Sequence, residues 1–273
     1  MTEGIPETIT GALYLPLRTE ARVPAVTLLH GGGGIEGNAV RWARTLNGSG
    51  VAVFLIDSYT GRGIPTHHPP DYADGRTMIV DAYRGLALLA QHPAVDPARI
   101  AVMGFSKGGE AALYASLTRF QRMHAPAGLE FVAYIAFYPP CWITFRSDEE
   151  VSDRPIRLLH GTADDWTPIE PCQEDVARLQ RQGKDVQLLA YPGAPHGFDM
   201  LWPRQHFAAY RGLGTCRLEE RLAGEIVNRA TGQPWRPTDA GTTEGVTAGA
   251  DPGAYAEAVK AVTAFLTDTF KRP

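Results

Sequence analysis

The chain has 273 residues, of which 44% are hydrophobic and 21% are charged. These proportions are close to those of ordinary globular proteins and argue against a disordered or coiled-coil chain. The 26 lysines and arginines are balanced by 30 aspartates and glutamates, which gives a formal net charge of −4. Without an excess of basic residues, the sequence gives no electrostatic reason to expect nucleic acid or a membrane surface as a partner.

The beginning of the chain and its cysteines narrow the class further. No apolar run approaches the roughly 20 residues needed to cross a bilayer. Residues 1–7 have neither the basic nor the apolar region of a signal peptide, so we expect a cytoplasmic protein. Cys141, Cys172 and Cys216 are too few and too scattered for a disulfide scaffold or a cysteine-based zinc site. No metal or organic cofactor is implied, and the oligomeric state is left open.

Short apolar runs alternate with longer helical patterns along the chain. A first run near 11–15 is expected to form an antiparallel edge strand. Six further runs are apolar on both faces, as is typical of buried parallel strands; they lie at 25–29, 51–56, 100–103, 131–137, 156–159 and 186–190. Helical patterns fall at about 38–47, 74–91, 107–120, 170–182 and 252–270. The alternation predicts one α/β domain over 1–273, with a mostly parallel central sheet and helices on both faces.

Residues 199–250 interrupt this alternation. They hold aromatic and charged residues, followed by a Gly/Thr-rich stretch from Thr238 to Gly249. We expect an irregular insertion, either a lid or a pocket wall, rather than a second domain. The last helix follows it, with Asp251 as N-cap and Pro252 at the first helical position.

The sharpest local motif is the G-x-S-x-G sequence from Gly104 to Gly108, centred on Ser106. It follows a predicted strand and opens a predicted helix, which is the context that this motif requires. Such a turn exposes the serine hydroxyl and directs backbone N–H groups to the same point. The alternative is a glycine-rich turn with an incidental serine.

A serine nucleophile needs a histidine base and a carboxylate that orients it. Asp164 and Asp165 follow the strand at 156–159, and His196 follows the strand at 186–190. The order Ser, Asp, His is that of the α/β-hydrolase arrangement. Taken singly, the acid could cap a loop and the histidine could lie in a surface turn. Candidates at three successive strand ends nevertheless predict a triad of Ser106, His196 and one of these two aspartates.

At these residues the sequence resembles the dienelactone hydrolase family of the α/β-hydrolase superfamily, over about 24–200. The resemblance rests on three segments: Gly104 to Gly109, His160-Gly161 with Asp164 and Pro168, and Ala194 to Phe198. It implies that Asp164 rather than Asp165 is the triad acid. It also implies that the backbone N–H groups of Gly32 and Lys107 form the oxyanion hole.

The sequence departs from the family prototype where that prototype binds its substrate. The prototype has a cysteine nucleophile with a glutamate beside it. In this sequence Ser106 stands at the position of the cysteine and Gly31 at that of the glutamate. It also binds a substrate carboxylate with two arginines. Arg62 lies near the first of these positions, and the second has no counterpart. Half of a carboxylate clamp is weak evidence for an acidic lactone, so hydrolysis of an ester by a serine triad is the better-supported expectation.

Substrate contacts are expected from residues near the same strand ends. Arg62 could contact substrate or could pin its own loop. The aromatic residues expected to line an apolar pocket, each with core packing as its alternative, are Tyr59, Phe105, Trp142, Trp166, Phe198 and Trp202. His67 and His68 are expected in a solvent-facing loop, and Glu110 as a helix-surface or buried, paired acid.

Cys141 and Cys172 each fall just after a strand end, on neighbouring strands, and we expect them to be close enough to form a disulfide. Such a pair would favour a secreted or periplasmic protein over a cytoplasmic one.

The sequence as a whole predicts a serine hydrolase that cleaves small-molecule carboxylic esters or lactones through an acyl-enzyme. An amidase, peptidase or acyltransferase could use the same residues. A non-catalytic binding module is the alternative outside enzymes, although none of the three candidate positions is missing.

Overall fold

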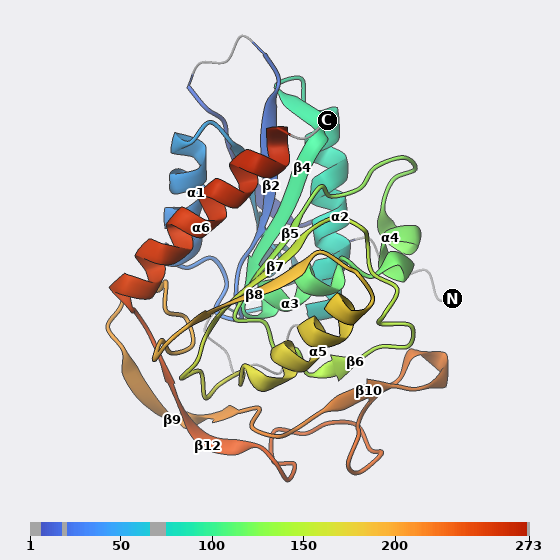
Figure 1. Cartoon of the computed structure of the whole chain (residues 1–273), viewed down its shortest axis with the longest axis vertical. Helices are drawn as coiled ribbons and strands as arrows, with labels where there is room; N and C mark the ends of the chain where they lie inside the picture. Colours follow the sequence, from blue (N-terminus) through green and yellow to red (C-terminus); the bar gives the residue numbers. More distant parts are fainter. Residues whose placement is uncertain (1–6, 18–20, 66–74, 272–273) are drawn as a thin grey trace.

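The computed structural model describes residues 7–17, 21–65 and 75–271, and His67 and His68 lie outside these ranges. Figure 1 shows a central sheet with helices packed on both of its faces. Seven strands form this sheet in the order β1-β3-β2-β4-β5-β7-β8. They are β1 (Thr10–Tyr14), β2 (Val23–Leu29), β3 (Ala52–Asp57), β4 (Val95–Phe105), β5 (Tyr134–Phe137), β7 (Ile156–Gly161) and β8 (Val186–Tyr191). All neighbours are parallel except β1, which pairs antiparallel with β3 at one edge.

The predicted elements therefore form the expected α/β architecture, a mostly parallel sheet between helices. The helices of the structure are α1 (Gly37–Gly48), α2 (Gly75–Gln91), α3 (Lys107–Tyr114), α4 (Thr118–His124), α5 (Glu170–Arg181) and α6 (Pro252–Lys271). The Asp251 carboxylate accepts a hydrogen bond from the Ala254 N–H at 3.0 Å, so the predicted N-cap of α6 is confirmed.

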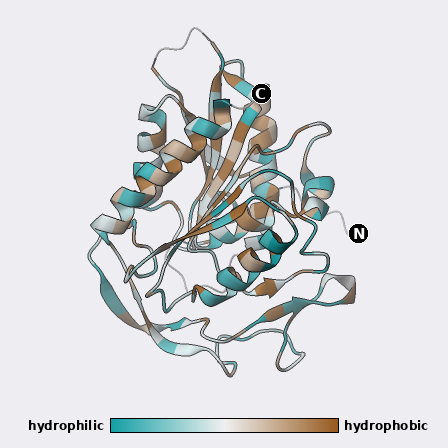
Figure 2. Ribbon diagram, in the orientation of Figure 1, coloured by the Kyte–Doolittle hydropathy of each residue, from teal (hydrophilic) through white to brown (hydrophobic). Residues whose placement is uncertain are grey.

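Alternate strand residues build the two layers of the core. In β4, Ile100 and Val102 face α2, α3 and α5, whereas Ala101 and Met103 face α1 and α6. Figure 2 shows the hydrophobic residues gathered on the inner strands. Strands that are apolar on both faces are buried by helices from both sides, which is why these runs lack the alternation of a half-exposed strand.

One predicted helix, 107–120, is divided into α3 and α4. No proline or glycine lies at the break. Instead, Leu117 forms an isolated bridge with Val151, and the Ser116 hydroxyl donates to the Leu113 carbonyl at 2.6 Å. Tertiary pairing thus overrides the helical propensity of this segment.

The expectation of an irregular insertion at 199–250 was wrong, because the segment forms two small sheets. In one, β9 (Gln205–Gly212) pairs antiparallel with β12 (Thr243–Ala248). In the other, β10 (Leu218–Glu220) lies between β11 (Ile226–Asn228) and β6 (Ile143–Thr144). Figure 1 shows these strands beyond the carboxyl ends of the central sheet, where they cover that edge.

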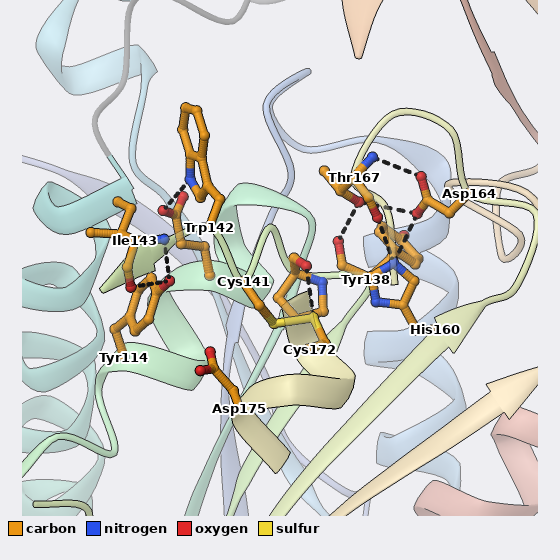
Figure 3. Close-up of a disulfide and its surroundings, with 12 residues drawn as sticks. Tyr114, Tyr138, Cys141, Trp142, Ile143, His160, Asp164, Thr167, Cys172 and Asp175 are labelled. Atoms are coloured by element: carbon orange, nitrogen blue, oxygen red, sulfur yellow. Dashed lines mark hydrogen bonds and ion pairs between the residues drawn. A yellow bond between two sulfur atoms is a disulfide. The ribbon is translucent and has the colours of Figure 1, made fainter. Parts of the chain in front are cut away.

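Cys141 and Cys172 form a disulfide, as expected, at a sequence separation of 31 (Figure 3). It joins the segment that follows β5 to the first turn of α5, and both cysteines are buried. Among the described residues, no helix is long and apolar enough to span a membrane.

Removal of this cross-link is expected to destabilise the protein markedly. The cross-link closes a loop of this length and so lowers the conformational entropy of the unfolded chain. The double variant C141S/C172S should therefore have an unfolding free energy about 3–4 kcal/mol lower than the wild type, as measured by urea denaturation. Cys216 is a buried free cysteine and offers a control, since C216S removes a thiol without a cross-link. Equal unfolding free energies for the double variant and the wild type would contradict the prediction.

Candidate active site

Ser106 occupies a sharp turn between β4 and α3. Its backbone has φ 50° and ψ −113°, a conformation that costs a non-glycine residue free energy and is concentrated at functional sites. The flanking glycines allow the turn. A Cβ atom at Gly104 would overlap the Gly108 carbonyl, and one at Gly108 would overlap the His30 carbonyl. The motif thus reflects close backbone approach at both glycines.

Ser106, His196 and Asp164 come together from three separate strand ends. The Ser106 Oγ lies 3.1 Å from the His196 Nε2, and the His196 Nδ1 lies 2.8 Å from the Asp164 Oδ2. Since a carboxylate only accepts, Nδ1 carries the proton and Nε2 is left to accept from the serine hydroxyl. The sequence predicted this grouping from the order of the strands.

Asp164 is almost fully buried and is held in its ionised form. Burial raises its pKa, but His196 and His160 outweigh this effect, and the pKa lies well below the usual range for aspartate. The backbone N–H groups of Trp166 and Thr167 also donate to Oδ1, at 3.0 and 2.8 Å. The carboxylate can therefore orient the imidazole and stabilise its protonated form.

Two neighbours of Asp164 had no predicted role. The Thr167 Oγ1 lies 3.1 Å from both the Asp164 Oδ2 and the His196 Nδ1. The His160 Nε2 lies 2.8 Å from the Thr167 carbonyl and 3.2 Å from the Asp164 Oδ2 (Figure 3). The signal for His160 was present, because it belongs to the His160-Gly161 element of the resemblance, whereas Thr167 had only its spacing from Asp164.

A buried acid anchors the loop that carries His196. Asp199 accepts hydrogen bonds from the Tyr138 hydroxyl at 2.6 Å, the Trp42 Nε1 at 2.8 Å and the Asn38 Nδ2 at 3.3 Å. Burial raises the pKa of Asp199, and these donors oppose that effect. The ring of Tyr138 packs edge-on against His196, with 4.7 Å between centroids. The His196 ring is therefore positioned by the Tyr138 ring as well as by its hydrogen bond to Asp164.

The glycine-rich segment after β2 lies next to the serine. The Gly34 N–H donates to the Gly31 carbonyl at 3.1 Å, which closes a tight turn. Buried His30 donates from Nδ1 to the same carbonyl at 2.7 Å and accepts at Nε2 from the Ser58 N–H at 3.1 Å. Burial lowers the His30 pKa, so this residue is a neutral support for the turn.

These groups open into a cavity of about 600 Å³. Most of the predicted site residues line it: Gly31, Gly32, Phe105, Ser106, Lys107, Trp142, Trp166, His196 and Trp202. Gly32 lies beside the Lys107 side chain, since a Cβ on Gly32 would be 3.7 Å from the Lys107 Cδ. The cavity size is within the range of small-molecule sites.

Arg62 does not line the cavity, which corrects the expected contact with substrate. Its guanidinium makes two hydrogen bonds to the Asp81 carboxylate, at 2.7 and 2.8 Å, and donates to the Ser58 carbonyl at 2.8 Å. These contacts raise the Arg62 pKa further. Arg62 therefore pins its own loop to α2, which was the alternative interpretation.

Tyr59 and Phe198 are likewise core residues rather than lining residues. Tyr59 packs edge-on against His30, and Phe198 packs against Phe137 and Tyr191. Both are buried, 3% and 0% exposed, with their rings committed to these contacts. Here the alternative of ordinary core packing is the correct one.

Glu110 is a buried, paired acid, which was one of its two expected roles. It is 6% exposed, and its Oε1 accepts from the Trp142 Nε1 at 3.2 Å. Asp165 also has a structural contact, because its Oδ1 accepts from the Thr247 N–H in β12 at 2.6 Å. In the part of the chain that the structure describes, no group of three or more His, Cys, Asp or Glu residues could hold a metal ion.

The insertion contributes a large part of the cavity wall. From β9 come Gln205, Phe207, Tyr210, Arg211 and Gly212, and from the segments around β10 and β11 come Leu218, Ile226 and Trp235. The insertion also meets the His196 loop directly, through an isolated bridge between His196 and Ala248. The segment is thus a wall of the site.

Comparisons with known proteins point to one family. The family model described as "Dienelactone hydrolase family" matches residues 9–211. A Bradyrhizobium protein named "Probable 2-oxo-3-(5-oxofuran-2-ylidene)propanoate lactonase" is 28% identical over 213 residues, which are 70% of this chain and 78% of that protein.

Solved structures share the fold. A Klebsiella pneumoniae structure that carries the dienelactone hydrolase name has a TM-score of 0.58 at 18% identity, covering 70% of this chain and 82% of that one. The propionate-bound esterase Est2 of Thermogutta terrifontis has a TM-score of 0.55 at 22% identity, covering 70% and 80%. With an α/β sheet, a serine at its sharp turn and a family match over most of its length, the chain belongs to the dienelactone hydrolase family of the α/β-hydrolase superfamily.

Proposed function

We propose that the chain forms one hydrolase domain, which cleaves carboxylic ester or lactone bonds through an acyl-enzyme on Ser106. The observation that carries the proposal is the hydrogen-bonded series from Ser106 through His196 to Asp164, which opens into the cavity. The lactonase name of the Bradyrhizobium relative and the esterase name of the Thermogutta structure support these two substrate classes.

Each residue has a defined role in this mechanism. Ser106 Oγ attacks the carbonyl carbon while His196 Nε2 takes its proton, and the Asp164 carboxylate stabilises the imidazolium that forms. The N–H groups of Gly32 and Lys107 donate to the oxyanion, a contribution for which one lost donor typically costs about 10²–10³ in kcat.

The second half of the reaction returns the site to its starting state. The imidazolium protonates the leaving oxygen, and His196 then takes a proton from water as that water attacks the acyl-enzyme. The tetrahedral intermediate collapses with release of the acid, and the proton returns to Ser106. For a lactone, the leaving oxygen stays joined to the product.

The disulfide is relevant to the cellular compartment of the protein. Disulfides persist in oxidising compartments and are rare in the cytosol. The buried Cys141–Cys172 bond therefore favours a secreted or periplasmic protein over a cytoplasmic one.

The test is hydrolysis of matched carbonyl substrates. The account predicts that 4-nitrophenyl butyrate and γ-butyrolactone are hydrolysed far above their rates in buffer, whereas the 4-nitroanilide of butyric acid reacts much more slowly. Turnover of the anilide in preference to the ester would favour an amidase. Rates equal to those in buffer for all three would contradict the proposal.

A further inference from the structure

One part of the cavity wall is formed by the apolar residues Trp142, Ile143, Leu218, Ile226 and Trp235, and we call this part the distal compartment. The small sheet brings these residues together, since β10 pairs with β6 on one side and with β11 on the other. Trp142 and Trp235 meet edge-to-face, with 5.1 Å between centroids and an interplanar angle of 87°. Aromatic rings prefer such arrangements and supply large apolar contact areas.

A second aromatic group lies beside His196. Trp166 packs 5.1 Å from the His196 ring, and Tyr210 packs 5.3 Å from Trp166. Phe207 completes this wall at 5.7 Å from Tyr210. The cavity therefore has aromatic walls at two places, and only this one adjoins the imidazole.

The reaction chemistry indicates which wall of the cavity contacts the leaving group of an ester and which contacts its acyl group. Because His196 must protonate the leaving oxygen, the leaving group has to lie on the imidazole side. The acyl chain then extends the other way. Trp142 lies in that direction, since its Nε1 donates to Glu110 one turn beyond Ser106 in α3, and Figure 3 shows Trp142 across the disulfide from Asp164.

The charges of the cavity do not suit an anionic acyl group. Arg62 is bound to Asp81 outside the cavity, and an acid, Glu110, adjoins the distal compartment. Arg211 is paired with Glu244 at 3.0 Å. The other cations of the lining, Arg76 and Lys107, have interactions of their own.

Three of the five residues that line the distal compartment lie outside the family match. The family model matches residues 9–211, whereas Leu218, Ile226 and Trp235 lie beyond that range. The substrate preference of relatives therefore does not carry over to this part of the site.

We propose that the distal compartment binds the acyl group of neutral esters that carry an aromatic or similarly bulky apolar acid, with Trp142 and Trp235 as the specificity-determining residues. This inference rests on the proposed esterase function. It predicts discrimination by size and by charge of the acyl group at a constant leaving group.

The experiment compares kcat/KM for four 4-nitrophenyl esters, each corrected for its rate in buffer. The 3-phenylpropanoate should exceed the acetate by at least about tenfold, in line with the value of apolar pocket contacts. The neutral hexanoate should exceed the adipate monoester, which has the same chain length but ends in a carboxylate.

Three variants locate the preference. Trp235→Ala removes one aromatic wall of the compartment, and Ile226→Trp fills the compartment with a larger side chain. Each variant should lower the ratio of kcat/KM for the 3-phenylpropanoate to kcat/KM for the acetate by about tenfold. Leu222→Ala is the matched control, because this exposed residue lies between β10 and β11 outside the cavity lining. Its ratio should equal that of the wild type. Ile226→Trp keeps the test decisive if Trp235→Ala fails to fold.

The outcomes separate the two proposals. If the wild type hydrolyses none of the four esters, the proposed function fails. If it hydrolyses them without a preference for the phenylpropanoate, prefers the adipate, or keeps its ratio in both compartment variants, esterase activity stands and the inference is overturned.

Discussion

Replacing Ser106 with alanine is expected to lower kcat for ester hydrolysis by about 10⁵–10⁶-fold, because the variant has no group that can form the acyl-enzyme. Alanine has no hydroxyl but meets the same backbone constraint as serine at φ 50°. We therefore expect the fold to be retained, as measured by circular dichroism and by the urea midpoint. The rate is measured with 4-nitrophenyl butyrate at a saturating concentration of this substrate.

Ser147 provides a matched control for this variant. It is a second serine with positive φ, 56°, and it lies exposed outside the cavity lining. Ser147→Ala should leave kcat within about twofold of the wild type. A Ser106→Ala variant that keeps even 1% of wild-type kcat, after contaminating activity is removed, would contradict the assignment of the nucleophile.

Asp164→Asn is expected to reduce kcat by about 10⁴-fold while the site keeps its shape. An asparagine amide can donate to Nδ1, which favours the imidazole tautomer whose Nε2 carries a proton and cannot accept one from Ser106. Asp165→Asn is the neighbouring control, since Asp165 bonds the Thr247 N–H instead of His196, and its kcat should stay within about threefold. Equal losses in the two variants would contradict the choice of Asp164.

The same variant has a pH-dependent effect on stability. The folded-state pKa of Asp164 is below the usual value, so its ionised form stabilises the fold above the unfolded-state pKa of about 4. That contribution is lost as the pH falls below about 4 toward the folded-state pKa. The difference in unfolding free energy between wild type and Asp164→Asn should therefore be larger at pH 6 than at pH 3, as measured by urea denaturation at both values. A difference that grows on acidification would contradict the low pKa.

The fold was predictable because its strands are buried on both faces. Runs such as 51–56 and 100–103 are continuously apolar, and each is followed by a polar residue or a glycine, Asp57 and Gly104. Since parallel strands expose their carboxyl ends at one edge, the order of the elements also placed Ser106, Asp164 and His196 at that edge. The edge strand β1 and the N-cap of α6 followed from equally local signals.

The insertion could not be predicted in this way. β10 and β11 have only three residues each, and in β9 the order QHFAAYRG does not alternate between apolar and polar residues. A register shift between Glu244 and Val246 in the partner strand breaks the period further. Their pairing depends on contacts with Ile143 and Asp165, which are distant in sequence.

The wrong substrate contacts have a related cause. The position of Arg62 after β3 suggested that it could reach the site, but the direction of its side chain is set by Asp81, 19 residues away. Asp199 illustrates the same limit, because its partners Trp42 and Tyr138 lie 157 and 61 residues away. Strand order places a residue at an edge of the sheet, and only tertiary packing decides where its side chain points.

The central claim is that Ser106 forms a covalent intermediate with the help of His196. It is tested most directly by the intact mass of the protein after reaction with one equivalent of a fluorophosphonate, followed by peptide mapping. The account predicts one adduct per chain on Ser106, with none in Ser106→Ala and strongly slowed labelling in His196→Ala. An unmodified wild-type chain, or an adduct on any other residue, would contradict it.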